Sequence, residues 1–322
     1  MSLKDLDDKI KKGNISGIYL LYGEEEFDLN RYLEKMKSTF GTLEIGVNFF
    51  VLDKTNVGTL ADICAAVSFL GASKFVVVKN SGLNFDTKML DEIDIEDVTI
   101  VFAEPSVDKR TTGYKYLTKK ACVCEFVKLD EKNAVMYVIS TLGKYKVKIS
   151  QSASEYMVSC CGTDKTNLIN ELKKIVAYLK PEDEVTTEII DKICVKTLNA
   201  KVFDMADLAV AKKHKEALSK LRDLIWQKES PIGISIILFK QIKQMYMIKL
   251  LESELNKNNR NTNIAEELGI HPFVYRKLSV ASQKYKLEEL ENLIKEFDEY
   301  DEGIKSGEMD AEKGIIRLVM LM

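Results

Sequence analysis

The chain lacks the long apolar runs and the hydrophobic leader that membrane-spanning and secreted proteins carry. None of its 322 residues fall in an apolar run near the ~18 that a membrane-spanning helix needs. Residues 1–12 are polar and charged, so there is no secretory hydrophobic region, and we expect a cytoplasmic protein. With only 4 prolines and no low-complexity tract, the sequence also argues against long disordered linkers.

Histidine is almost absent, with 2 residues, and the cysteines are poorly spaced for metal binding. The 6 cysteines include only two close pairs, Cys122-x-Cys124 and Cys160-Cys161, and no C-x-x-C motif. These spacings match no standard tetrahedral zinc site, and there is no G-x-S-x-G or recognisable Cys–His pair. We therefore expect reduced and mostly buried thiols, no metal, no cofactor and no catalytic residue.

An excess of positive charge is missing as well. Lys and Arg number 47 against 50 Asp and Glu, a formal net charge of -3, so no overall basic field attracts nucleic acid. The hydrophobic fraction of 46% is that of an ordinary globular protein, and the length suits roughly two or three domains.

Residues 17–127 alternate short apolar runs with helical patterns. The runs are rich in Val, Ile and Phe, as buried parallel strands are. They are Gly17–Tyr22, Val47–Leu52, Phe75–Val78, Val98–Phe102 and Cys122–Val127. Helical patterns between them cover Phe27–Met36 and Leu60–Leu70, and Gly71 is a helix stop. This βαβα series predicts an α/β domain with an open parallel sheet and helices on both faces.

After about Leu129 the strand signal disappears and helical patterns follow to the end of the chain. Thr163-Asp164 and Thr186-Thr187 mark helix starts, and Pro181 ends one of the patterns. Longer helices are predicted over Lys213–Gln227, Pro231–Leu255 and Leu287–Ile304. We predict three domains, namely an α/β domain over 1–128, a small helical lid domain over 129–198 and an all-α collar domain over 199–322.

An α/β domain followed by a small helical domain is typical of AAA+ P-loop NTPases, but the phosphate-binding residues are missing. A phosphate loop needs closely spaced glycines and a lysine directly after the first strand. Here Gly23 is followed by Glu24, Glu25 and Glu26, which would repel a triphosphate and themselves satisfy the helix dipole. Because Lys79-Asn80 also replaces the expected metal-binding acid, we interpret this domain as an NTPase scaffold with a degenerate phosphate loop.

Two other segments could be taken for parts of a nucleotide site. Glu104 at the end of the fourth strand could hold a metal, but a lone surface carboxylate is our preferred interpretation. Residues 162–166, Gly-Thr-Asp-Lys-Thr, imitate a fragment of a phosphate loop. They follow a helix and not a strand, so we interpret them as a turn and a helix cap.

The segment 264–278 resembles a helix-turn-helix with Gly269 at the turn. A sequence-specific DNA-binding regulator is therefore the alternative function. The surroundings argue against it, since residues 200–322 hold as many acidic as basic side chains and the helix that follows is acidic.

Six segments, in order from one end of the chain to the other, together resemble one family. They are Ile18–Phe27 (IYLLYGEEEF), Phe69–Val78 (FLGASKFVVV), Asn170–Lys174 (NELKK), Glu229–Ile232 (ESPI), Leu268–Phe273 (LGIHPF) and Asp301–Gly307 (DEGIKSG). In this order they resemble the delta subunit of bacterial DNA polymerase III, the clamp-loader subunit that takes part in DNA replication. Lys173 stands where the family pattern usually has Glu.

The resemblance implies a non-catalytic part of the DNA polymerase III holoenzyme. It implies an AAA+-like module that binds no ATP, and a collar that assembles with the gamma/tau and delta-prime subunits. It also implies that the first domain binds and opens the sliding clamp, beta, so that the complex loads it on primed DNA. No membrane partner is implied.

The resemblance places the clamp-binding residues at Phe69 and Leu70. At ~100° per residue, Phe69 points away from the face of the helix that should pack on the sheet, and Leu70 lies at its edge. That packing face carries Leu60, Ile63, Cys64 and Val67. An outward phenylalanine is either a stray exposed aromatic or an anchor for a partner, and the resemblance favours the anchor.

The longest helix of the collar also suggests a partner. Its apolar residues spread around most of its circumference, which suits burial on several sides. They are Ile234, Ile236, Ile237, Leu238, Ile242, Met245, Met247 and Ile248. We therefore expect the collar domain to be the oligomerisation domain.

Overall fold

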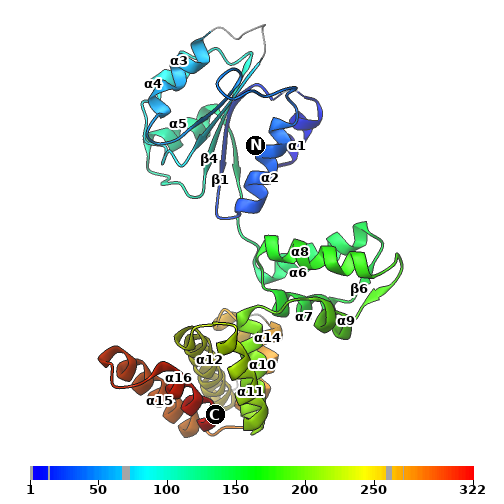
Figure 1. Ribbon diagram of the computed structural model, residues 1–322, viewed down its shortest axis with the longest axis vertical. Coiled ribbons are helices and arrows are strands. Elements are labelled where there is room, and N and C mark those ends of the chain that lie inside the picture. Colours follow the sequence, from blue (N-terminus) through cyan, green and yellow to red (C-terminus); the bar gives the residue numbers. More distant parts are fainter. Residues whose placement is uncertain (1–2, 14, 67–72, 259–262, 271) are drawn as a thin grey trace. The chain divides into compact units, whose positions relative to one another are not determined.

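The computed structural model describes residues 3–13, 15–66, 73–258, 263–270 and 272–322 (Figure 1). Side-chain burial is described for the same residues except 255–258. The chain divides into two compact units, Met1–Leu129 and Asp130–Met322. The predicted class is confirmed: an α/β unit with a parallel sheet is followed by a helical region.

A five-stranded parallel sheet forms the centre of the first unit, in the order β2-β3-β4-β1-β5. Its strands are β1 Gly17–Tyr22, β2 Phe49–Leu52, β3 Lys74–Lys79, β4 Val98–Glu104 and β5 Cys122–Glu125. Every residue of β1 and β4 is buried, because helices cover both faces of the sheet there. All five predicted strands are present, and the edge strand β2 starts two residues later than its apolar run suggested.

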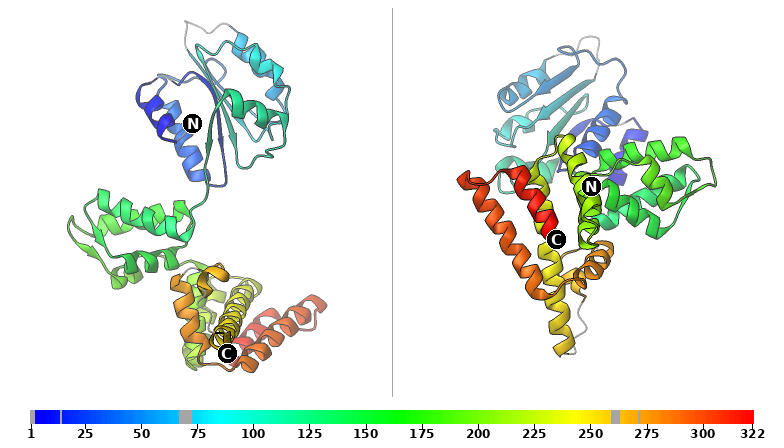
Figure 2. Two further views of the ribbon diagram at one scale, coloured as in Figure 1. Left: turned by 180° about the vertical axis from the view of Figure 1, so that it is seen from behind. Right: turned by 60° about the horizontal axis from the view of Figure 1, so that its bottom comes forward.

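Helices cover the sheet on both faces (Figure 1; Figure 2, left). On one face, α1 Leu3–Lys11 and α2 Glu26–Lys37 pack against alternate strand residues such as Tyr19 and Leu21. The other face carries the 3-10 turn η1 Val57–Thr59, α3 Leu60–Ala65, α4 Lys88–Asp91 and α5 Thr112–Lys120. The period-two alternation of the strands thus gives the unit two separate apolar cores.

The first part of the second unit contains four helices and a small sheet. The helices are α6 Glu131–Lys144, α7 Gln151–Cys161, α8 Lys165–Tyr178 and α9 Thr187–Ile193. The prediction that strands end near Leu129 is wrong, since β6 Lys148–Ile149 pairs in parallel with β7 Glu184–Val185. Strands of two residues are too short to leave a readable alternation in the sequence.

The remaining seven helices share one large apolar core. They are α10 Leu198–Val210, α11 His214–Trp226, α12 Pro231–Asn258, α13 Ile264–Glu267, α14 Pro272–Ser282, α15 Leu287–Ser306 and α16 Ala311–Leu321. The long helix α12 contacts α10, α14, α15 and α16, while α15 and α16 pack side by side (Figure 2, right). Within the described part of the chain, no helix has the length and apolarity to cross a membrane.

Candidate functional site

The carboxyl edge of β1 and β4 is the place where this fold would bind a nucleotide. The chain leaves β1 for α2 on one face of the sheet and leaves β4 for α5 on the other. Ligands of open α/β sheets bind in the crevice outside the strands at such a switch point. The groups that occupy this crevice therefore decide what the first unit can bind.

The loop after β1 is closed by backbone hydrogen bonds. The amide of Gly23 donates to the carbonyl of Glu104 at 3.0 Å, and the amide of Glu25 donates to the carbonyl of Phe126 at 3.1 Å. Gly23 has φ +134°, and a Cβ there would lie 2.1 Å from the Phe126 oxygen. The amides of Gly23 and Glu25 are thus already paired, although a phosphate cradle needs such groups free.

Three glutamates follow this glycine, as the sequence showed, but they are not equivalent. Glu24 and Glu26 are exposed, and Glu24 forms a long ion pair with Lys128 at 3.9 Å. Glu25 is buried and immediately precedes α2, whose first turn also contains Glu26. Negative charge at this helix terminus satisfies the helix dipole without any ligand.

The interpretation of Glu104 as a lone surface carboxylate is wrong. The side chain is only 2% exposed, and both of its oxygens accept hydrogen bonds. Oε1 accepts from the amide and the hydroxyl of Ser81 at 2.8 and 2.6 Å, and Oε2 accepts from the amide of Gly82 at 3.2 Å. Glu104 therefore holds the turn that follows β3, at the position where an NTPase would use an acid to bind its metal.

An aromatic pair lies at the same edge of the sheet. The rings of Tyr22 and Tyr114 meet edge to face at 5.9 Å, and their hydroxyls lie 3.4 Å apart. The ammonium of Lys109 lies 5.9 Å from the centre of the Tyr22 ring. Burial, reinforced by the hydrogen bond to Tyr114, raises the pKa of Tyr22, so this phenol stays neutral.

The predicted clamp-binding residues Phe69 and Leu70 lie outside the described residues, as do Val67 and Gly71. The predicted helix Leu60–Leu70 is shorter than expected, because α3 ends at Ala65 and Ala66 is extended, with φ −59° and ψ 135°. The packing face is confirmed for its described residues: Leu60 is fully buried, and Ile63 and Cys64 pack beside it against the sheet.

Lys74, the first residue of β3, terminates this helix. Its residue is 3% exposed, and its ammonium donates to the carbonyls of Ile63 at 2.7 Å, Cys64 at 3.3 Å and Ala66. A cation at the carbonyl end of a helix satisfies unpaired acceptors and the negative end of the dipole. The sequence gave no sign of this contact, because the lysine comes eight residues after the last carbonyl that it caps.

Residues 162–166 form a turn and a helix cap, as predicted. Gly162 ends α7 with φ +78°, and the Asp164 side chain accepts from the Asn167 amide at the start of α8. The Lys165 ammonium lies 4.8 Å from the centre of the Tyr137 ring, and the residue is buried. The lysine that imitated a phosphate-loop residue is therefore part of the packing of this helical region.

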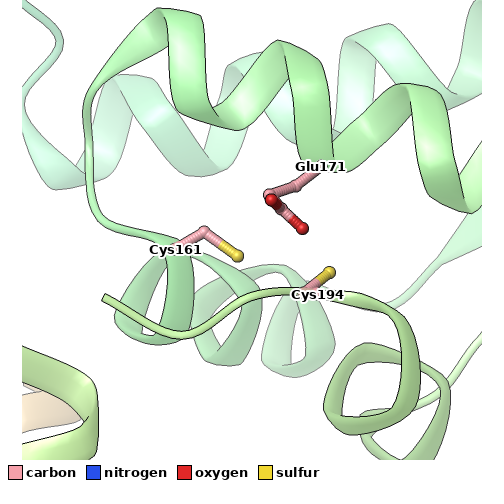
Figure 3. Close-up of side chains that lie close together, drawn as sticks. All are labelled: Cys161, Glu171 and Cys194. Carbon is pink, nitrogen blue, oxygen red and sulfur yellow. The ribbon is translucent and has the colours of Figure 1, made fainter. Parts of the chain in front are cut away.

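All six cysteines are free, and five of them are buried, in agreement with the expected reduced thiols. The spacing argument nevertheless missed one group. Cys161, Glu171 and Cys194 bring two thiols and one carboxylate oxygen within 4.8 Å of one another (Figure 3). No spacing rule could have found these three, because they come from three different elements.

The helix-turn-helix-like segment has a first helix, α13, of only four residues, and Gly269 turns with φ +61°. The second helix, α14, packs on α12 and α7. Of its exposed cations, Arg276 pairs with Glu155 of α7 at 3.1 Å, and Lys277 lies over the Phe273 ring at 5.3 Å.

Comparisons with known proteins agree with the resemblance seen in the sequence. Residues 199–322 match the model of the family described as DNA polymerase III delta subunit, C-terminal domain. DNA polymerase III subunit delta of Bacillus subtilis (strain 168) is 21% identical, over 96% of this chain and 93% of its own. The probable DNA polymerase III subunit delta of Aquifex aeolicus (strain VF5) is 24% identical, over 86% of this chain and 83% of its own.

A solved structure supports the fold along the whole chain. The Bacillus subtilis DNA clamp loader delta protein superposes with a TM-score of 0.59 and 21% identity, covering 98% of this chain and 99% of its own. The expected resemblance is therefore confirmed: residues 199–322 belong to the C-terminal domain family of the DNA polymerase III delta subunit, and the chain is similar to delta subunits from end to end.

Proposed function

We propose that this protein is the clamp-loader subunit that binds and opens the sliding clamp in DNA replication. In this proposal it works in the cytoplasm with the gamma/tau and delta-prime subunits, whose ATP-driven complex loads the clamp on primed DNA. It contributes no active site of its own to the polymerase holoenzyme. Its roles divide among an α/β clamp-binding domain over 1–128, a lid domain over 129–198 and a collar domain over 199–322.

The single observation that carries the proposal is the closed crevice at the switch point of the sheet. The amides of Gly23 and Glu25 and the carboxylate of Glu104 are used by backbone and side-chain partners of the same unit. A subunit with this scaffold and these closed groups has no site for a triphosphate. It therefore depends on partner subunits for ATP, which fits a passive arm that grips the clamp.

We propose that Phe69 and Leu70 bind the clamp. They follow the end of α3, whose last carbonyls are held by the buried ammonium of Lys74. The chain that presents the two apolar residues is thus fixed to the sheet on both sides, by the packing of α3 and by β3. A preordered segment loses less conformational entropy on binding than a free one.

The collar has apolar surface that its own core does not cover. Trp226, the chain's single tryptophan, is 86% exposed at the end of α11, and Ile236 on α12 is 63% exposed. Ile232, Met320 and Leu321 are exposed as well. Large exposed apolar side chains of this kind favour a protein interface, and we assign them to contacts with the partner subunits.

The alternative, a DNA-binding regulator that uses residues 264–278, has less support. Its first helix is one turn long, and the Arg276 guanidinium is paired with Glu155. A recognition helix needs free cationic and polar side chains for phosphates and base edges. We therefore do not assign this segment to sequence-specific recognition.

The test is to mix the purified chain with the sliding clamp of the same organism and to separate the mixture by size exclusion. We expect a complex of the two proteins, and no uptake of labelled ATP with Mg²⁺ by the chain alone. A truncated chain that ends near Asn199 should keep the clamp but fail to join gamma/tau and delta-prime. Absence of a clamp complex, or a stoichiometric ATP site of micromolar affinity, would overturn the proposal.

A further inference from the structure

A buried group of two thiols and a carboxylate lies in the second unit, apart from everything assigned above. Cys161 is the last residue of α7, Glu171 lies in α8, and Cys194 directly follows α9. Their exposed fractions are 0%, 4% and 9%. Figure 3 shows the Glu171 carboxylate directed toward the two sulfur atoms, with all ligand atoms within 4.8 Å of one another.

This donor set suits one metal ion. Thiolate sulfur lies about 2.3 Å from Zn²⁺ and carboxylate oxygen about 2.0–2.2 Å, so two ligands of one zinc are less than about 4.6 Å apart. The observed upper limit of 4.8 Å is close enough for small side-chain rotations to close the group around an ion. Soft thiolates select zinc-like cations over Mg²⁺ and Ca²⁺, which prefer oxygen ligands.

The surroundings orient the carboxylate as a metal site requires. Glu171 Oε2 accepts from the Val195 amide at 3.0 Å and from the Lys174 ammonium at 2.6 Å. Such outer contacts commonly fix the ligating carboxylate of a metal site. They also balance the charge: two thiolates and a carboxylate carry three negative charges, which the divalent ion and Lys174 neutralise. A buried cluster of zero net charge avoids the cost of an unpaired buried ion.

We propose that Cys161, Glu171 and Cys194 bind one zinc-class divalent cation, with a fourth position for water. Binding converts two thiols to thiolates and releases two protons, because Cys194 and burial raise the pKa of Cys161 in the free protein. The ion joins the ends of α7 and α9 to the middle of α8. In a helical region of modest size, such a tie adds stability that the apolar core supplies only in part.

The experiment uses the full chain, stripped of metal by a chelator and kept reduced. Titration with Co²⁺ should give one equivalent of sulfur-to-cobalt charge-transfer absorption, and Zn²⁺ should abolish that absorption and raise the unfolding temperature. Cys161→Ala and Cys194→Ala should each lose the absorption. Glu171→Gln keeps both thiols and should weaken Co²⁺ binding at least ~10-fold.

Cys160→Ala is the matched control. It removes an equally buried thiol from the same helix, one residue away, but outside the group, so it should keep full Co²⁺ absorption. Failure of the reduced wild-type chain to take up Co²⁺ or Zn²⁺ would overturn the proposal. So would an absorption that Cys160→Ala loses and Cys161→Ala keeps, or a Cys161–Cys194 disulfide in a chain that binds no metal once reduced. If an alanine variant fails to fold, Glu171→Gln decides the question.

Discussion

Lys74→Met replaces the buried ammonium at the end of α3 with an uncharged side chain of similar length. The methionine still fills the space, but it donates no hydrogen bond to the carbonyls of Ile63, Cys64 and Ala66. The substitution therefore separates the role of the charge from the role of the volume. Its effect should appear in the first unit, where α3 packs against the sheet.

The magnitude follows from the number and type of lost contacts. A hydrogen bond to a charged donor contributes about 1.5–3 kcal/mol, and the helix dipole adds about 0.3–1 kcal/mol. The cost of burying an ammonium offsets part of this sum, and water can reach the exposed end of the helix. We expect a net loss of about 2–4 kcal/mol, or roughly 6–15 °C in the unfolding temperature of a unit of this size.

Differential scanning calorimetry of the full chain measures this effect, with Lys79→Met as the control. Lys79 is the last residue of the same strand and is exposed, so its replacement should leave the unfolding temperature nearly unchanged. Clamp affinity of Lys74→Met should also fall, because the segment that holds Phe69 and Leu70 loses its anchor. Indistinguishable unfolding temperatures for the two variants would refute the stabilising role of the Lys74 contacts.

Three other predictions concern the same unit. Gly23→Ala should destabilise it by about 3 kcal/mol or more, measured by urea unfolding, because the new Cβ would meet the Phe126 carbonyl at 2.1 Å in a strained backbone region; an unchanged midpoint would contradict the closed loop. Replacing both Phe69 and Leu70 with alanine should weaken clamp binding about 100-fold or more by calorimetry, since each buried apolar side chain contributes roughly 1.5–3 kcal/mol; equal affinity in a well-folded variant would refute the wedge. Asp7 accepts hydrogen bonds from α2, and although burial raises its pKa, these bonds bring it below the usual 3.8. The stability that it adds is present above pH 3.8 and is lost as the pH falls through the lowered pKa, so Asp7→Asn should flatten the acid limb of a pH-stability curve; an identical limb would contradict this role.

The sequence predicted those parts of the fold that short-range patterns encode. The five strands are continuous Val, Ile and Phe runs, and Asp164 and Thr186 cap the helices that they were expected to begin. The end of α3 was missed because its cap comes from Lys74 on the following strand, which no helical pattern includes. Strands β6 and β7 were missed because each has only two residues.

The candidate site was predicted in its chemistry but not in its geometry. Three successive glutamates excluded a phosphate loop from the sequence alone, since their charges can be read without coordinates. The burial of Glu104 depends on Ser81 and Gly82, which follow a different strand, so its surroundings could not be read from its neighbours in sequence. The role of Phe69 and Leu70 stays a prediction.

The closed loop after β1 has an evolutionary consequence. Only Glu24 and Glu25 separate Gly23 from the first residue of α2, whereas a G-x-x-x-x-G-K-S/T cradle needs a longer connection before its lysine. Point mutations could exchange the glutamates, but they could not lengthen the loop or release its amides from Glu104 and Phe126. Return to a nucleotide-binding ancestor-like state would require an insertion together with the loss of two backbone hydrogen bonds. Drift by substitution alone therefore keeps a lineage with this loop on the side without nucleotide binding.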